Sequence, residues 1–527
     1  MFLANPAIYR PPLAKRVFLI ALKRRATSAA ATASAPVKSY DEIPGPKPLP
    51  LIGNAWRFLP YIGSWDTTDF AKWTKSLLDE YGKIVKIGNL PGRKDMIMIF
   101  DPDTIADVFK NEGPYPERMK FESVKYYREK IRPDFYEGFQ GIVNENGERW
   151  LQARSIINQP MMKIEVANLY VPKSDQVSKD FVKLVKALRG SNMEMAADFK
   201  NEIHKWALES IALIALDTRL GCLQQHLAKD SDAQKMIDAV VQIFELTYEL
   251  DFKVPFWKLF PSKTMEALIG YSDNVLEISL KYVDQARSKF GDLSATETPE
   301  MSVLQRILKR DQSSKRAVIM CMDMIFAGVD TTSNTAACTL YYLACNPDKQ
   351  EKLYQEIKSV VLANPCENLT AEHLNKMKYL KACIKEATRL APVVNGTARA
   401  LPKDVVLHNY LIPKQKADIF MFNSTLYRQE EHYPDAKKFI PERWMREDKS
   451  CPVRKANKAH PFVFLPFGHG VRQCPGMRFA NMEMETFIAR MLLEFKVEWH
   501  QPPLTFISKA LQTPLSPLQF TILDRNK

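Results

Sequence analysis

One cysteine lies in a stretch that is suited to present its sulfur to a ligand. Residues 467–476 read Phe-Gly-His-Gly-Val-Arg-Gln-Cys-Pro-Gly and place Cys474 just before a proline. Three glycines permit backbone conformations and close approaches that a Cβ would resist: Gly468, Gly470 and Gly476. A thiolate, the form that binds metals, needs nearby positive charge or N–H donors, and Arg472 is a candidate for that charge. The simpler interpretation is that Cys474 is a small buried apolar residue, as many free cysteines are.

A second stretch places polar residues inside an apolar helix. Residues 317–346 form the longest apolar helical pattern, and its middle reads Ala-Gly-Val-Asp-Thr-Thr from Ala327. Gly328 costs about 1 kcal/mol against alanine, and a buried Asp330 without a partner costs several more. The Thr331 hydroxyl can bond the carbonyl four residues back, bend the helix and leave a notch beside Gly328 for a diatomic ligand. Asp330 and Thr331 could then relay protons, although a simple kink inside a core helix would explain the same residues.

Both stretches resemble signatures of the cytochrome P450 family. All six fixed positions of the haem-binding loop Phe-Gly-x-Gly-x-Arg-x-Cys-x-Gly are met, and so is the helix signature Ala-Gly-x-Asp/Glu-Thr-Thr/Ser. The resemblance implies haem b whose iron is bound by Cys474, and O2 as co-substrate. It implies that Asp330 and Thr331 deliver protons to bound oxygen and that Arg472 pairs with a haem propionate. Further loop residues implied at the cofactor are Phe467, Gly468 and Gly476.

The same resemblance gives roles to two other sets of residues at a haem. Trp150 and Arg154 lie four apart, so a helix puts them on one face, where both could reach propionate oxygens. Trp-x-x-x-Arg is common by chance, and a packed tryptophan beside a solvated arginine is the alternative. Arg399, placed at the start of a short hairpin, is implied to supply another propionate contact.

A buried ion-pair network is expected to support the haem loop. Glu386 and Arg389 lie three apart on one helix face, and the segment Pro-Glu-Arg-Trp supplies Arg443. By resemblance these three residues form a structural network that locks the loop carrying Cys474. The plain alternative is an ordinary ion pair.

Electrons must come from another protein, because the chain has no glycine-rich nucleotide fingerprint with which to bind a nicotinamide. The resemblance implies a 2Fe-2S ferredoxin and its reductase, with NADPH acting only through them. Lys381, Lys385 and Arg478 would form the basic face that attracts an acidic ferredoxin. Met477 stands where many mitochondrial members carry arginine, and a merely solvated basic face remains the alternative.

Mainly helical structure with a smaller β-rich portion, the cytochrome P450 fold, is expected to position these residues. Helical periodicity dominates from about residue 145 to 390, with a long helix over 206–223 that ends at Gly221 and an apolar helix over 240–250. Outside that range the patterns predict a helix over 69–81, paired strands at 84–87 and 96–100, and a hairpin over 405–407 and 410–413.

Composition divides the chain into a leader, a hinge and one folded domain. Residues 1–40 carry seven basic residues and no acid, out of a net charge of +13, and are typical of a mitochondrial transit peptide. A basic tail without an address function is the alternative. Residues 41–53 form a proline-rich hinge, and residues 54–527 are the expected catalytic domain. Eight cysteines without a CxxC pair argue against zinc or a disulfide framework.

The leader contains no apolar run near the roughly 20 residues of a membrane span. We therefore expect the matrix side of the inner mitochondrial membrane, with peripheral contact. An aromatic turn at 254–261 supplies candidates for that contact, although such turns are usually core: Phe256, Trp257 and Phe260.

The chain as a whole resembles an insect-type mitochondrial cytochrome P450. The implied function is insertion of one oxygen atom from O2 into a lipophilic substrate, with no nucleic-acid partner. Steroid or ecdysteroid-like substrates and xenobiotics are both open, since a fold does not settle a function. A haem-thiolate isomerase or dehydratase and a non-enzymatic haem sensor are the other candidates, although the former typically lacks an acid-alcohol pair.

Overall fold

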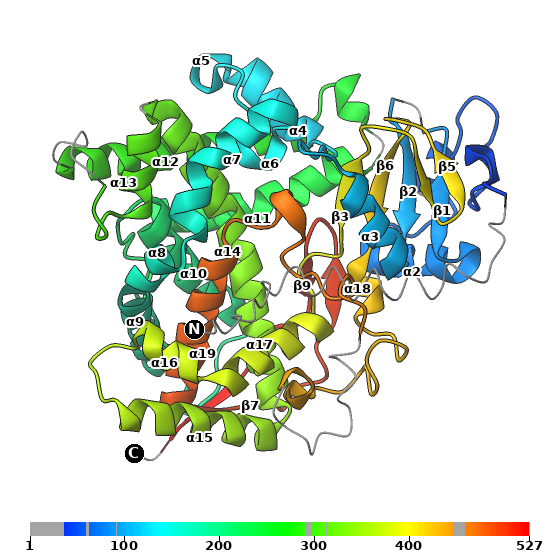
Figure 1. Cartoon of the computed structure of the whole chain (residues 1–527). Helices are drawn as coiled ribbons and strands as arrows, with labels where there is room; N and C mark the ends of the chain where they lie inside the picture. Colours follow the sequence, from blue (N-terminus) through cyan, green and yellow to red (C-terminus); the bar gives the residue numbers. More distant parts are fainter. Residues whose placement is uncertain are drawn as a thin grey trace, which may run out of the picture.

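Helices make up most of the protein, and strands gather mainly at one side of it (Figure 1). The computed structural model describes residues 36–527, apart from 60–62, 91, 254, 291–296, 312, 446–458 and 526–527. The expected transit peptide therefore lies almost entirely outside the described residues. Mainly helical structure with a smaller strand portion confirms the expected fold class.

The helices alternate with short loops along most of the chain. In the described residues they are α2 (Phe70–Tyr81), α3 (Pro102–Asn111), α4 (Glu122–Tyr126), α5 (Pro133–Tyr136), α6 (Gly141–Asn144), α7 (Gly147–Met162), α8 (Ile164–Leu169), α9 (Val171–Leu188), α10 (Phe199–Ala215), α11 (Asp232–Thr247), α12 (Lys263–Lys289), α13 (Val303–Arg310), α14 (Ser314–Ala344), α15 (Pro347–Ala363), α16 (Ala371–Lys376), α17 (Lys378–Leu390), α18 (Asn423–Leu426) and α19 (Met477–Glu494). Two π-helical turns, η3 (Tyr127–Ile131) and η4 (Tyr248–Phe252), extend α4 and α11. Short 3-10 turns include η1 (Tyr40–Glu42), η2 (Ala55–Phe58), η5 (Phe256–Lys258), η6 (Pro441–Trp444) and η8 (Gly470–Arg472).

One four-stranded sheet combines strands from an early and a late part of the chain. Its order is β1-β2-β6-β3, formed by β1 (Ile84–Ile87), β2 (Asp95–Ile99), β6 (Ala417–Met421) and β3 (Thr397–Ala400). β2 pairs with β1 antiparallel and with β6 parallel, in the register Asp95 to Ala417. The two-stranded sheets pair β4 (Val405–Leu407) with β5 (Tyr410–Ile412), β7 (Phe495–Glu498) with β10 (Thr521–Asp524), and β8 (Phe506–Ser508) with β9 (Gln512–Pro514).

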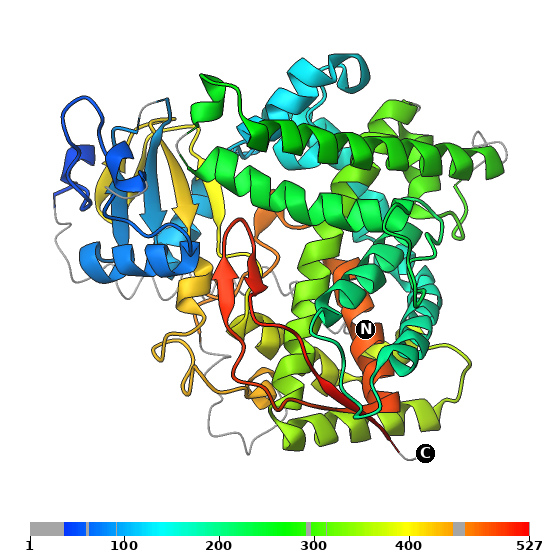
Figure 2. The same cartoon turned by 180° about the vertical axis from the view of Figure 1, so that it is seen from behind.

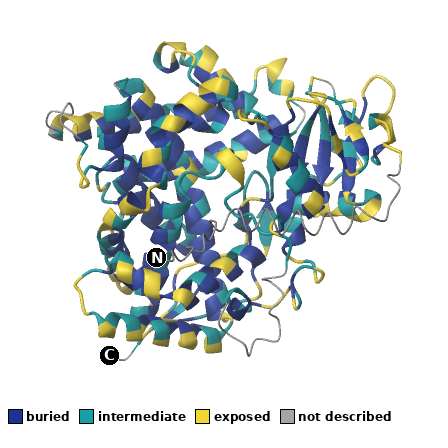
Figure 3. Ribbon diagram, viewed as in Figure 1, coloured by how far each residue is buried: buried dark blue, intermediate teal, exposed yellow. Residues whose placement is uncertain are grey.

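Helix α14 runs through the middle of the helical part and is buried along most of its length (Figures 1 and 3). It packs against α10, α17 and α19, and it begins after Ser313, whose side chain accepts the Arg316 N–H. Its bounds confirm the helix predicted over 317–346. Seen from behind, α11 and α12 lie on one side of α14, and the β8–β9 hairpin lies beside it (Figure 2).

Local predictions near the N-terminus are confirmed, and one central helix lies earlier in the chain than predicted, because α10 begins at Phe199 rather than at Trp206. α2 begins after Asp69, whose carboxylate caps two backbone N–H groups, and the hairpin strands fall within one residue of their predicted bounds. α10, by contrast, ends at Ala215 rather than at Gly221. The buried carboxylate of Glu209 accepts hydrogen bonds from Arg219 and from the N–H of Cys222, so the chain leaves the helix and turns back toward it.

The proline-rich hinge lies against strand β1. The Lys86 N–H donates to the Pro44 carbonyl at 2.7 Å, and Ile43 is buried in the apolar core around the sheet. A Cβ on Gly45 would lie 2.0 Å from the Lys86 carbonyl oxygen, so this close approach requires glycine. These contacts thus hold the hinge against the edge of the four-stranded sheet.

A buried carboxylate links the π-helical turn η4 to helix α4. Asp251, in η4, is 4% exposed and accepts hydrogen bonds from the Ser123 N–H at 3.0 Å and from the Ser123 hydroxyl at 2.7 Å. Ser123 lies in the first turn of α4, so the contact holds the end of α11 against α4. Burial raises the pKa of Asp251 from 3.8 to about 6, against the opposing effect of the Ser123 hydrogen bonds and the Arg93 charge.

This pKa predicts a pH-dependent contribution to stability. Because folded Asp251 binds its proton at a higher pH than the unfolded chain does, the folded state gains stability as pH falls from about 6 toward 4. The gain is about 3 kcal/mol at most, at 1.4 kcal/mol per pKa unit. Asp251→Asn removes this contribution, so the difference in unfolding free energy between wild type and the variant should change over that range. A difference that stays constant from pH 4 to pH 7 would contradict the prediction.

Candidate active site

Cys474 lies directly before helix α19, at the end of a loop with two left-handed glycines. Gly468 and Gly470 have φ of 73° and 74°, a region that glycine enters without strain. The Cys474 N–H donates to the Phe467 carbonyl at 2.9 Å, which closes the loop. Gly476, expected to need special freedom, has φ of −81°, and a Cβ there would touch the sulfur at 3.9 Å. Gly476 therefore does not use the backbone freedom of glycine, and a Cβ there would make only an ordinary van der Waals contact with the sulfur.

Opposing effects act on the thiol of Cys474. Burial raises its pKa, while the backbone N–H of Gly476, the Arg154 charge, the N–H of Met477 and the Arg118 charge lower it. The N–H groups are those at the beginning of α19, where a helix favours negative charge. The donors that a thiolate needs are thus in place at the sulfur.

Arg472 points toward the backbone of two other segments, at Pro116 and Glu145. It donates to the carbonyls of Pro116 and Glu145, each at 2.9 Å, and its guanidinium lies 3.9 Å from the centre of the Trp150 ring. The positive charges that act on the thiol come mainly from Arg154 and Arg118, so the expectation that Arg472 supplies this charge is corrected. Arg154, from α7, instead reaches the loop directly and donates to the Gln473 carbonyl at 2.6 Å.

Arginines from four segments converge beside the loop. Burial and then repulsion from the other arginines lower the pKa of Arg472 to about 8 and that of Arg118 to about 10. Arg154 and Arg399 are also buried and contribute to both shifts. Arg118 was missed in the sequence, because a single arginine in a loop carries no local pattern that distinguishes it.

Arg399 lies in β3 of the four-stranded sheet. It was expected at the start of the short hairpin, which is formed instead by β4 and β5. The arginine is held by the buried carboxylate of Glu112 and by Thr397. A Cβ on Gly470 would lie 2.7 Å from the Glu112 carboxylate, so the second loop glycine is needed where this acid approaches. One arginine of the group therefore has a protein anion beside it.

These residues fit an anionic prosthetic group such as haem. Arg154 Nε and Arg472 Nη1 are buried without a hydrogen-bond partner, which is costly for a charged group inside a protein. Carboxylates of a bound group would satisfy these N–H donors and relieve the repulsion among the arginines. The arrangement can thus hold a doubly negative group next to one sulfur.

On α14 the polar signature has two distinct surroundings. Thr331 donates its hydroxyl proton to the Ala327 carbonyl at 2.6 Å, as expected, and Ala327 is exposed although the helix around it is buried. Gly328 faces α10, since a Cβ there would lie 2.8 Å from the Ile211 side chain, and the notch expected beside it stays a prediction. Gly328 therefore allows α10 and α14 to approach, and the open surface lies at Ala327.

Asp330 is buried and faces α10. Its Oδ1 lies 2.8 Å from Nε2 of His204, and both side chains are 6% exposed. His204 was missed in the sequence analysis, because the pairing depends on the packing of two helices that are distant in sequence. The acid of the signature is therefore partnered inside the protein.

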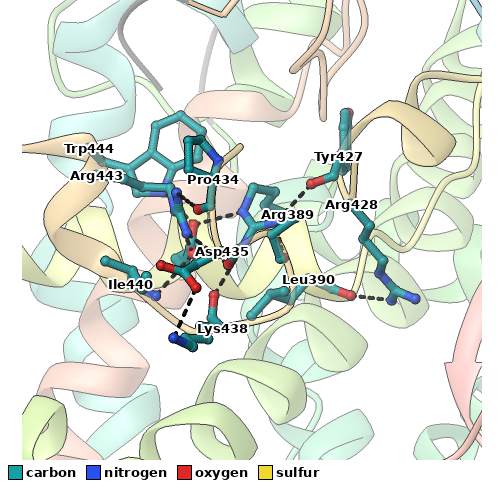
Figure 4. A network of polar contacts seen from close by, with 12 residues as sticks. Arg389, Leu390, Tyr427, Arg428, Pro434, Asp435, Lys438, Ile440, Arg443 and Trp444 are labelled. Atoms are coloured by element: carbon teal, nitrogen blue, oxygen red, sulfur yellow. Dashed lines mark hydrogen bonds and ion pairs between the residues drawn. The ribbon is translucent and has the colours of Figure 1, made fainter. Parts of the chain in front are cut away.

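The Glu386 network has the predicted contacts (Figure 4). Arg389 donates to both Glu386 oxygens at 2.8 and 2.9 Å, and Arg443 Nε donates to Oε1 at 2.8 Å. Trp444 Nε1 also donates to Glu386, and all three charged side chains are fully buried. The remaining arginine donors bond backbone carbonyls of Tyr427, Pro434, Asp435, Ala436 and Lys438. One carboxylate thus ties α17 to the chain that leads into the Cys474 loop.

The proposed ferredoxin face is only partly basic. Lys381 lies 3.9 Å from Glu485 of α19, and burial raises the pKa of that carboxyl to about 7 while Lys381 and Lys385 lower it. Lys385 is exposed one turn further along α17, whereas Arg478 is half-buried at the start of α19 with Nε unpartnered. The three cations thus come from two helices that pack together.

Fold and site together define a helical protein that presents one thiol beside buried arginines, with an acid-alcohol pair on its central helix. The family model described as Cytochrome P450 matches residues 43–522. The chain is 35% identical to "Probable cytochrome P450 49a1" of Drosophila melanogaster over 94% of its length and 84% of that protein. It is 36% identical to "Probable cytochrome P450 301a1, mitochondrial" of the same fly, over 91% and 86%. A third relative, "Cytochrome P450 CYP12A2" of Musca domestica, is 35% identical over 92% and 91%.

The chain belongs to the cytochrome P450 family. It is thus a haem-thiolate monooxygenase, and its similarity to insect members confirms the resemblance drawn from the two motifs.

Neutralising Glu386 should release the haem loop. Glu386→Gln leaves two buried arginines without their anion, so we expect a loss of about 3 to 5 kcal/mol in unfolding free energy. Haem content per protein, read from the Soret absorbance, should fall with it. Glu372→Gln on α16 removes an exposed ion pair with Lys376 and serves as the control, because such pairs contribute little. Full haem content and an unchanged melting temperature in Glu386→Gln would show that the network is dispensable.

Proposed function

We propose that the protein is a mitochondrial monooxygenase that inserts one oxygen atom from O2 into a lipophilic small molecule. The observation that carries this proposal is the thiol of Cys474 at the start of α19, next to buried arginines with unpaired N–H groups. In the proposal Cys474 binds the iron of haem b, and the propionates meet Arg118, Arg154, Arg399 and Arg472, with Trp150 beneath Arg472.

Haem, when bound, supplies the iron at which O2 is reduced and the substrate oxidised. The protein's own contribution is to orient that group and to control water and protons. Arginine N–H donors would orient the group through its carboxylates, and the N–H groups of Gly476 and Met477 would stabilise negative charge on the sulfur. Asp330 would pass protons toward Thr331, whose hydroxyl is oriented by its hydrogen bond to the Ala327 carbonyl. The buried apolar face of α14 excludes bulk water from this step.

Electrons would arrive from a 2Fe-2S ferredoxin that its reductase loads from NADPH. Support comes from the cations of α17 and α19, namely Lys381, Lys385 and Arg478, and from relatives whose names place them in mitochondria. Acidic ferredoxins are attracted to such a face at long range, and high salt weakens the attraction.

Membrane contact would come from the turn that follows α11. Phe256, Leu259 and Phe260 are 53%, 76% and 64% exposed, whereas Trp257 packs against Tyr126 and donates to the Leu250 carbonyl. No helix of the described chain is both long and apolar enough to cross a bilayer. We propose peripheral attachment at the matrix side of the inner membrane through the exposed apolar residues of this turn, after removal of a leader near residues 1–40.

The first test is turnover with the complete electron chain. With NADPH, a mitochondrial ferredoxin and its reductase, the wild type should convert a bound lipophile to a monooxygenated product. Cys474→Ser should lose the thiolate-type carbon monoxide spectrum and all turnover, whereas Cys345→Ser, at the exposed end of α14, should keep both. A thiolate spectrum without NADPH-driven turnover across substrates would favour a haem-thiolate isomerase, a dehydratase or a sensor.

An optical titration of the ferric protein addresses the substrate class. A ligand that displaces iron-bound water shifts the Soret band, so ecdysteroid precursors and insecticide-like lipophiles can be compared directly. Tight saturation by one or two sterols is expected of a dedicated steroid hydroxylase, and weak shifts across many foreign compounds are expected of a detoxifying enzyme.

A further inference from the structure

A histidine from a neighbouring helix is the buried partner of the acid on α14. Nε2 of His204 lies 2.8 Å from Oδ1 of Asp330, although the imidazole ring is not aligned for a conventional hydrogen bond and Nε2 has no other partner. His204 is 5% exposed, on the side of α10 that packs along α14. An isolated carboxylate at this depth would cost several kcal/mol, so the imidazole is what allows Asp330 to remain inside.

The packing that brings them together depends on Gly328. Two helical turns beyond His204, the Ile211 side chain occupies the position that a Cβ of Gly328 would need. Two residues of the Ala-Gly-x-Asp signature therefore act where α10 approaches α14. Gly328 leaves room for Ile211, and Asp330 supplies the acid that His204 meets. Asp330 is fixed further because its backbone carbonyl accepts the side-chain amide of Asn334 at 2.7 Å.

Charged groups continue from this pair toward the outside. Lys200 lies one turn before His204 and is partly exposed; burial lowers its pKa, while Asp330 and Glu245 raise it. Glu245, from α11, is half exposed and lies 3.3 Å from Lys509. Other titratable groups on these two helices are the buried thiol of Cys338 on α14, which acts on Lys200, and the Lys205–Glu202 pair on α10.

We propose that His204 is a positioning and proton-carrying residue for Asp330. The imidazole holds the carboxylate in place and hands it protons that enter between α10 and α14 from the side of Lys200. The proposal rests on the proposed monooxygenase function, in which one O2, two electrons and two protons give one oxygen atom in the product and one water. Each proton that Asp330 donates toward Thr331 is replaced by the proton on His204 Nε2, which solvent then restores through the Lys200 side. Histidine suits this role because both ring nitrogens exchange protons near neutral pH.

The first experiment separates the positioning of Asp330 from the transfer of protons to it. It uses the haem-loaded enzyme with ferredoxin and reductase. His204→Gln supplies an amide N–H donor in place of the imidazole but cannot shuttle protons. We expect the fraction of NADPH electrons recovered in product to fall about tenfold or more, with more peroxide released and a larger D2O effect on turnover. The substrate is the lipophile that gives the strongest Soret shift, and its affinity should not change.

His373→Gln is the matched control, because His373 is equally buried but belongs to α16, where it bonds the Asn364 carbonyl. It should leave electron recovery and the D2O effect unchanged. Wild-type recovery and D2O effect in His204→Gln would overturn the proton-carrying role. Absence of turnover in the wild type would overturn the proposed function, and the proton-carrying role with it.

A second experiment tests the pairing without activity. Melting temperatures of His204→Phe, Asp330→Asn and the double variant form a cycle that measures their coupling. We expect each single variant to lower the melting temperature and the double variant to fall no further than the worse single one. Additive shifts, or no shift in either single variant, would show that the two side chains do not hold one another.

Discussion

Uncompensated positive charge beside Cys474 is the constraint on which the rest of the site depends. Arg118, Arg154, Arg399 and Arg472 arrive from a loop, from α7, from β3 and from the cysteine loop, and burial together with the neighbouring positive charges lowers the pKa of Arg118 and of Arg472. Glu112 offsets part of this charge at Arg399. Like charges gathered in a low-dielectric interior are tolerated only when an anion joins them, so the site is complete only with its prosthetic group.

The two sides of the cysteine loop are stabilised by opposite means. On the arginine side, buried N–H donors have no anionic partner in the described part of the protein. On the α17 side, Glu386 accepts hydrogen bonds from two arginines and a tryptophan. A loop with left-handed glycines has little structure of its own to resist distortion. The loop geometry therefore depends on the Glu386 network. This network can keep the sulfur in place while the arginine side accommodates a large planar group.

Much of this arrangement could be predicted from the sequence where the signal is local. The cysteine loop, the α14 signature and the Glu-x-x-Arg pattern carry their chemistry within a few residues, and helix α2 carries its own cap. Features that depend on tertiary contact could not be predicted in this way. Arg118 stands alone in a loop, His204 meets Asp330 only through helix packing, and α10 ends early because Glu209 draws the chain back. Gly328 shows the limit most clearly, because nothing in its local pattern indicates that Ile211 of α10 packs against it.

The order of strands in the main sheet has a consequence for how the chain is made. β2 lies between β1, a few residues earlier, and β6, which follows more than three hundred residues later in the register Asp95 to Ala417. During synthesis, one edge of β2 must wait without its partner until most of the chain has emerged. Exposed strand edges pair readily with other chains, and contacts so distant in sequence form slowly. A product that stops before β6 therefore carries a template for aggregation, and the sheet makes quality control sensitive to whether synthesis has passed Met421.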